Sequence, residues 1–182
     1  MIFRNVDAVS GATQKPDGGS KVLVAYFSCT GSTEKIANHI ADILGVAAYR
    51  ITPETPYTSA DLNYSDSSTR ATREQNDASA RPAISGSVEN MADYDVVFLG
   101  YPIWWGQAPR IMCTFVESCD LAGKTMIPFC TSGSSGISSS ATNLQKSASE
   151  AKWLAGSRFS GGASRDSIVS WVNGLGLELT AE

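Results

Sequence analysis

Hydroxyl side chains are concentrated in one short segment near the start of the sequence. Ser28, Thr30, Ser32 and Thr33 surround Gly31, and a stretch with helical spacing follows directly. The first turn of a helix offers free backbone N–H groups and the positive end of the helix dipole, so hydroxyls at this point can complete a binding site for phosphate oxygens. A simpler alternative is that the hydroxyls only cap the start of the helix.

This segment differs from the two common nucleotide-binding loops. A Walker A loop needs a Lys after its second glycine, and a dinucleotide-binding turn needs the pattern GxGxxG; neither is present. A phosphate bound here would therefore be held by neutral groups.

Two later segments have the composition to contact a flat ligand. Trp104, Trp105 and Gly106 follow an apolar run, and adjacent tryptophans are costly to leave in water. They either pack under neighbouring loops or place one ring against an aromatic ligand, and both assignments of the two rings remain open. The segment from Thr131 to Gly136 contains only Ser, Thr and Gly, a permissive backbone whose N–H and C=O groups can meet the edge of a flat ring.

The elements that position these segments follow from the apolar pattern. Nearly continuous apolar runs are typical of strands buried on both faces of a parallel sheet, and apolar residues at helical spacing indicate amphipathic helices. Strands are predicted at 21–27, 46–51, 94–101, 124–130 and 156–159, and helices at 33–44, 109–119, 144–154 and 165–175. A polar excursion from Thr52 to Ala92 contains one further short helix within 67–79.

Alternating strands and helices predict right-handed crossovers and a doubly wound parallel α/β sheet. Ligands of such sheets bind beyond the carboxyl ends of the strands. All three chemically distinctive segments follow strands, so we expect them at the same edge of the sheet.

Composition and charge narrow the partners and the location. Residues 1–20 are expected to be a polar N-terminal tail, and residues 21–182 a single domain. The net charge of -4 without a cluster of Lys and Arg disfavours a nucleic-acid partner. No apolar run approaches the roughly 20 residues of a membrane-spanning helix. The first residues lack the pattern of a secretory signal, so a cytoplasmic location is expected.

Hydrolytic and metal chemistry are not indicated. The single histidine, His39, is expected on the exposed side of the first helix, and no GxSxG motif is present. A cysteine phosphatase needs an Arg six positions after its Cys, where Cys29 has Lys35 and Cys130 has Gly136. The cysteines also lack the spacing of a zinc site or a disulfide framework. We therefore predict no catalytic side chain and no metal ligand.

The ordered set of segments resembles the flavodoxin family. The segment from Ser28 to Thr33 is similar to the family's phosphate-loop pattern [ST]-x-T-G-x-T, and YDVVFLGYPIWWGQAP and GKTMIPFCTSGSSG are similar to its second and third FMN-binding loops. The resemblance covers roughly residues 21 to 175. It implies a flavodoxin-like three-layer α/β/α sandwich, a five-stranded parallel sheet of order 2-1-3-4-5, and non-covalently bound FMN.

By the same resemblance, the FMN-binding residues fall into three groups. The phosphate would be held by Ser28, Thr30, Gly31, Ser32 and Thr33. One side of the isoalloxazine would be flanked by Pro102, Ile103, Trp104, Trp105 and Gly106. The ring would be met from the third loop by Thr131, Ser132 and Gly133.

Two departures from the family bear on function. Family members commonly place a second aromatic ring over the flavin from the third loop and are strongly acidic, whereas residues 131–140 contain no aromatic residue and the net charge is only -4. One flavin face is therefore expected to be more open to a substrate. A phosphate without a cation also predicts a low reduction potential, unless Arg110 lies close enough to offset it.

Two functions remain open at this point. The chain is either an electron carrier that serves redox partner proteins or an oxidoreductase that moves electrons from NAD(P)H to a quinone or a similar small acceptor. A monomer or a homodimer is expected in either case.

One further motif lies in the N-terminal tail. The segment from Asp7 to Thr13 (DAVSGAT) resembles the attachment motif of covalently flavinylated domains, in which the final Thr carries FMN through a phosphodiester. The domain that normally surrounds this motif is absent, so we expect a chance match.

Overall fold

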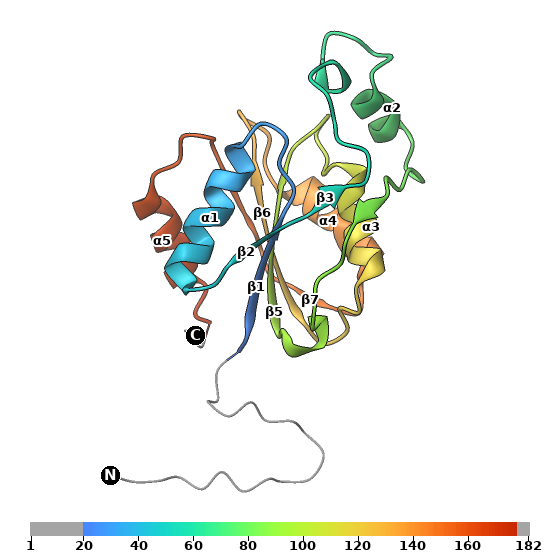
Figure 1. Cartoon of the computed structure of the whole chain (residues 1–182). Coiled ribbons are helices and arrows are strands. Elements are labelled where there is room, and N and C mark those ends of the chain that lie inside the picture. The colour runs from blue at the N-terminus through green and yellow to red at the C-terminus, as the bar shows by residue number, and fades with distance from the viewer. Residues whose placement is uncertain (1–19, 178–182) are drawn as a thin grey trace, which may run out of the picture.

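The computed structural model describes residues 20–177, and its centre is a parallel sheet between two layers of helices (Figure 1). In sheet order the strands are β2 (Ala48–Arg50), β1 (Val22–Tyr26), β5 (Val96–Pro102) and β6 (Thr125–Thr131), followed by β7 (Lys152–Trp153) and β8 (Ser157–Phe159), which both pair with β6. Every pairing within this sheet is parallel. The predicted order 2-1-3-4-5 is confirmed, with the fifth strand interrupted to form β7 and β8.

Helices bury both faces of this sheet, which explains the continuous apolar runs. Figure 1 shows α1 (Ser32–Leu44) and α5 (Arg165–Gly174) on one face, and α3 (Arg110–Ser118) and α4 (Ser138–Ser147) on the other. Alternate residues of β1 point to opposite faces, with Leu23 in the core under α3 and α4 and Val24 in the core under α1. Because each face needs an apolar side chain, every position of β1 is buried.

The polar excursion folds into a separate set of short elements. These are β3 (Thr52–Pro53), η1 (Ala60–Leu62), α2 (Arg70–Asn76), β4 (Ile84–Ser85) and η2 (Met91–Asp93), and β3 pairs with β4 in antiparallel orientation. The predicted helix within 67–79 is therefore present as α2. In Figure 1 the part around α2 projects beyond the carboxyl ends of the central strands.

A reciprocal set of hydrogen bonds fastens α2 to the loop after β5. The Gln75 side chain donates to the carbonyl oxygens of Trp104 (2.7 Å) and Ala108 (3.2 Å). Arg110 donates in the other direction, to the carbonyl oxygens of Glu74 (3.3 Å) and Gln75 (2.8 Å). The excursion is thus anchored against the site edge of the sheet.

The helix predicted at 144–154 is wrong in its position. The structure has α4 at Ser138–Ser147, and Trp153 belongs to β7. The helix begins earlier than expected because its buried side includes Ser140, whose hydroxyl is hydrogen-bonded to that of Tyr101 (3.0 Å). An apolar pattern cannot detect a buried serine.

Residues 1–19 and 178–182 lie outside the described residues, and with them lie almost all of the predicted tail and Thr13. In the described part of the chain, no helix has the length and apolar character needed to cross a membrane.

Candidate functional site

The phosphate-loop candidate forms the sharp corner between β1 and α1. Gly31 stands at the N-cap position with φ 95°, a left-handed conformation that glycine adopts without strain. No side chain caps α1, and the same holds for α3 and α4, whereas Thr69 and Ser164 cap α2 and α5 with their hydroxyls. The simpler reading of a hydroxyl-capped helix start is therefore wrong for α1, and its first-turn N–H groups are left for another acceptor.

One hydroxyl of this corner, that of Thr33, meets the last residue of β6. The Oγ1 atoms of Thr33 and Thr131 lie 2.6 Å apart, and both side chains are buried. Each hydroxyl carries one hydrogen, so only one of the two is used between them. The second hydrogen remains for a ligand oxygen.

The two tryptophans of the second loop have different environments. Trp104 is 7% exposed, and its ring packs edge-on against Phe27 (centroids 5.6 Å apart) and Tyr57 (5.3 Å). Trp105 is 50% exposed and does not line the cavity described below. The sequence left open whether the tryptophans pack as local core or contact a ligand. Trp104 does both, since it belongs to the core and also lines the cavity.

An arginine fastens the third loop from behind. Arg158, in β8, donates from Nε to Ser132 Oγ (3.1 Å) and from Nη2 to the carbonyl oxygens of Ser132 (2.7 Å) and Gly133. These carbonyl groups are thereby engaged. The Ser132 N–H also has a partner, the Phe159 carbonyl oxygen (3.2 Å), so the Gly133 N–H is the one of these two that has no hydrogen-bond partner among the described residues. Nothing in the spacing of the sequence indicated Arg158.

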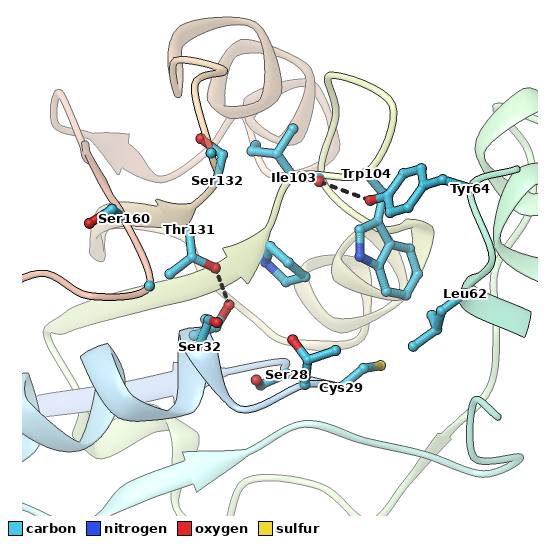
Figure 2. Close-up of a pocket in the computed structure, with 15 residues that line it drawn as sticks. Ser28, Cys29, Ser32, Leu62, Tyr64, Ile103, Trp104, Thr131, Ser132 and Ser160 are labelled. Carbon is cyan, nitrogen blue, oxygen red and sulfur yellow. Dashed lines mark hydrogen bonds between the residues drawn. The ribbon is translucent and has the colours of Figure 1, made fainter. Parts of the chain in front are cut away.

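These loops enclose one cavity of about 350 Å³ at the carboxyl edge of the sheet (Figure 2). Ten of the predicted residues line it: Ser28, Thr30, Ser32, Thr33, Pro102, Ile103, Trp104, Thr131, Ser132 and Gly133. Three predicted residues do not line it: Gly31, Trp105 and Gly106. Of these, Gly31 shapes the corner through its left-handed φ, and Trp105 and Gly106 form a turn outside the cavity.

Five lining residues were not predicted. Ser160 and Gly161 follow β8, and a Cβ on Gly161 would lie 2.9 Å from Ser32 Oγ, so this segment packs closely on the phosphate-loop candidate. The rule that ligands bind beyond the carboxyl ends of strands would have identified them. Cys29 lies within the predicted loop, while Leu62 and Tyr64 come from the excursion and had no sequence signal.

The sequence predicted that one face of the flavin is more open, and the position of Tyr64 argues against this. The third loop supplies no aromatic residue, but Tyr64 reaches the same cavity from the excursion, beside Ile103 and Trp104 (Figure 2). Its hydroxyl donates to the Ile103 carbonyl oxygen over a long 3.4 Å. One wall of the cavity is therefore aromatic, although its ring comes from a different segment.

The described lining of the cavity carries no charged side chain, because no Lys, Arg, His, Asp or Glu is among it. Burial raises the pKa of the Cys29 thiol to about 11 and raises the pKa of Tyr64 above its usual value, so both stay protonated at neutral pH. Arg110 is directed to carbonyl oxygens of α2 and does not line the cavity.

One cation does lie directly behind the phosphate-loop candidate. Arg50 donates to the Ser28 carbonyl oxygen (2.9 Å) and forms an ion pair with Glu34 (2.6 Å). Because Glu34 offsets its charge, Arg50 holds the loop in place more than it makes the cavity positive.

The site therefore fits a ligand with a phosphate at one end and a flat ring at the other. An uncapped helix start surrounded by hydroxyls suits the phosphate, and an apolar wall of Ile103, Trp104 and Tyr64 suits the ring. The fold and the site define a doubly wound α/β protein that binds a mononucleotide at its sheet edge.

The chain belongs to the flavodoxin family, since the family model described as Flavodoxin matches residues 21–175. Family membership makes FMN the cofactor of this site. No curated protein matches the sequence.

Solved structures agree with this assignment. Putative flavoproteins from Bacteroides eggerthii and Bacteroides uniformis are 45% and 44% identical to this chain in sequence, with TM-scores of 0.82 and 0.81. The matched regions cover 87% and 85% of this chain and 99% of each of the two flavoproteins. A flavoprotein from Lactobacillus acidophilus in complex with FMN is 18% identical, with a TM-score of 0.62, and covers 84% of this chain and 98% of that one. The similarity to the Lactobacillus acidophilus flavoprotein is a similarity of fold.

Proposed function

We propose that this chain is a flavodoxin-like redox protein that binds FMN non-covalently and transfers electrons through it. When bound, FMN supplies a ring that takes up and releases electrons. The observation that carries the proposal is the uncapped start of α1, whose surrounding hydroxyls open into the same cavity as the Trp104 wall and the third loop.

The chain's own residues hold and orient the cofactor. Ser28, Thr30 and Ser32 stand around the phosphate position, with Thr33 and Thr131 supplying the one hydroxyl hydrogen that they do not use between themselves. The Gly133 N–H of the third loop is available to the ring edge, because the Ser132 N–H already donates to the Phe159 carbonyl oxygen and Arg158 holds the loop by its carbonyl oxygens. Trp104 and Ile103 exclude water from one side.

The neutral lining supports the low reduction potential expected from the sequence. A phosphate held by hydroxyl and N–H groups keeps its charge uncompensated within the cavity, which disfavours further negative charge on the reduced ring. Arg110, which the sequence left as a possible counter-charge, donates to carbonyl oxygens of α2 and does not line the cavity. A redox titration should give a potential below that of free FMN, and a potential at or above it would contradict this reasoning.

A second candidate function is an NAD(P)H-linked oxidoreductase that acts on a small acceptor, as distinct from an electron carrier. The observation in its favour is that the anchored excursion contributes Leu62 and Tyr64 to the cavity lining, an apolar wall suited to a small-molecule acceptor. As a carrier the chain would instead exchange electrons with a redox partner protein. We propose a cytoplasmic monomer or homodimer in both cases.

One experiment separates these functions. FMN-loaded protein is mixed anaerobically with NADH or NADPH, and the flavin absorbance is followed before and after a quinone is added. Bleaching followed by turnover supports the oxidoreductase, whereas bleaching only after a reductase protein is added supports the carrier. Failure of the purified chain to bind FMN refutes both.

A further inference from the structure

Two large apolar side chains are strongly exposed among the described residues, and they touch each other. Tyr64 is 54% exposed and Trp105 is 50% exposed, and their ring centroids lie 5.1 Å apart with an angle of 60° between the planes. Tyr64 also lines the cofactor cavity (Figure 2). This aromatic rim, Tyr64 with Trp105, therefore stands at the cavity mouth.

Trp105 is presented by a strained backbone. Its φ is 53° and that of Gly106 is 75°, within a tight turn closed by hydrogen bonds from Trp104 N to Gln107 O (2.8 Å) and from Gln107 N to Trp104 O (3.1 Å). Turns with two successive left-handed residues favour Asn, Asp or Gly at the first position. A large aromatic residue there costs free energy, and such strain is concentrated at functional sites.

The structure holds this rim in place before any ligand arrives. The Trp104 carbonyl oxygen, at the base of the turn, accepts a second hydrogen bond from the buried side chain of Gln75. Tyr64 lies two residues after Leu62, the last residue of the short η1 segment, and the Leu62 side chain packs against the core. Both rings are thus carried by anchored segments, which lowers the entropic cost of binding a ligand upon them.

We propose that the aromatic rim is the binding site for a planar, uncharged aromatic electron acceptor of the quinone class. The proposal rests on the proposed function, because the electrons come from the reduced cofactor in the adjoining cavity. The acceptor takes up two electrons and two protons, so that its two C=O groups become C–OH groups, while the reduced cofactor that supplies them returns to its oxidised form.

The chemistry of the rim selects this class of acceptor. Aromatic faces and edges bind flat rings. The described residues that line the small hollow beside Tyr64 and Trp105 include no charged side chain that could recognise a charged group. The Tyr64 hydroxyl makes only one long bond of 3.4 Å, to the Ile103 carbonyl oxygen, so it can turn to donate to a quinone carbonyl instead.

The test measures binding of 1,4-naphthoquinone to oxidised, FMN-loaded protein by titration calorimetry, with FMN affinity measured separately for each variant. Trp105→Asn removes the ring and places at this turn the residue type that its backbone favours, so the fold is kept. Tyr64→Ser removes the second ring, and Tyr64→Phe is the matched control that retains it. The non-aromatic 1,4-cyclohexanedione is the matched control ligand.

We expect saturable binding of naphthoquinone, no binding of the cyclic dione, and roughly three- to ten-fold weaker binding of naphthoquinone in Trp105→Asn and in Tyr64→Ser. Tyr64→Phe should stay within about three-fold of the wild type, because the ring is the larger contribution. Normal FMN affinity with no naphthoquinone binding, or with unchanged binding in Trp105→Asn, overturns this inference and leaves the proposed function standing. Loss of FMN binding by the wild type refutes the proposed function and, with it, the acceptor site.

Discussion

The hydroxyl pair of Thr33 and Thr131 allows a quantitative test of how the phosphate is held. The two Oγ1 atoms lie 2.6 Å apart in a buried position, and one of their two hydrogens is free to donate to a ligand. Valine has nearly the same shape as threonine and lacks the hydroxyl. We therefore consider Thr33→Val, Thr131→Val and the double variant.

The expected losses follow from hydrogen-bond energies. A hydrogen bond to a charged acceptor contributes about 1.5–3 kcal/mol, so the double variant should bind FMN roughly 10- to 150-fold more weakly. The single variant that removes the donating hydroxyl should lose most of this affinity. Without ligand, either single variant should lower the free energy of unfolding by about 1 kcal/mol, and the second substitution should add little because no orphaned hydroxyl remains.

Fluorescence titration with FMN and urea unfolding of the apoprotein measure both quantities. The matched control is Thr114→Val, because the Thr114 hydroxyl is buried without a hydrogen-bond partner and does not line the cavity. This control should leave FMN affinity unchanged. FMN affinity within two-fold of the wild type in the double variant would refute the assignment of this hydroxyl pair to the phosphate.

Three further predictions test the surroundings of the site. Because the pKa of Cys29 is about 11, the rate of its alkylation by iodoacetamide should increase about ten-fold per pH unit between pH 7 and 10, and bound FMN should slow the reaction. Peptide mass mapping measures this rate. A rate that does not depend on pH, or that FMN does not change, would contradict the prediction. Gly156→Ala should destabilise the chain by about 1–3 kcal/mol in urea unfolding, since its Cβ would lie 2.1 Å from the Pro128 carbonyl oxygen. The control variant is Gly162→Ala, where an added Cβ would meet no atom within 4 Å. Equal urea midpoints for the two variants would contradict the prediction. Gln75→Leu should cost about 1–3 kcal/mol and speed amide exchange in the second loop, because the Ala108 carbonyl oxygen loses its side-chain donor and the Trp104 carbonyl oxygen keeps only the bond from the Gln107 N–H. Unchanged exchange would contradict this role.

The central sheet and most of the site were predictable from sequence for a physical reason. Strands such as β1, buried on both faces, must be apolar throughout, and the loops that follow parallel strands must meet at one edge. The segments beginning at Ser28, Pro102 and Thr131 were therefore placed together without knowledge of their contacts. The order of the strands, the cofactor and the set of binding residues came from the resemblance to the flavodoxin family.

The features that escaped prediction depend on buried polar contacts. The excursion is fixed on the sheet edge by hydrogen bonds from the Gln75 side chain to the second loop and from Arg110 to the carbonyl oxygen of Gln75, neither of which leaves a periodic pattern. The sequence therefore did not predict that Tyr64 lines the cavity. Likewise, the start of α4 was missed because Ser140, a polar residue, fills a core position.

The most direct test of the phosphate-binding corner compares FMN with riboflavin, which has the same ring and no phosphate. We predict that FMN binds roughly 100-fold or more tightly, because at least two charge-assisted hydrogen bonds of about 1.5 kcal/mol each are gained. We also predict that this ratio changes little with salt, since no charged side chain is present in the described cavity lining. Equal affinity for the two ligands would contradict the placement of the phosphate at the start of α1.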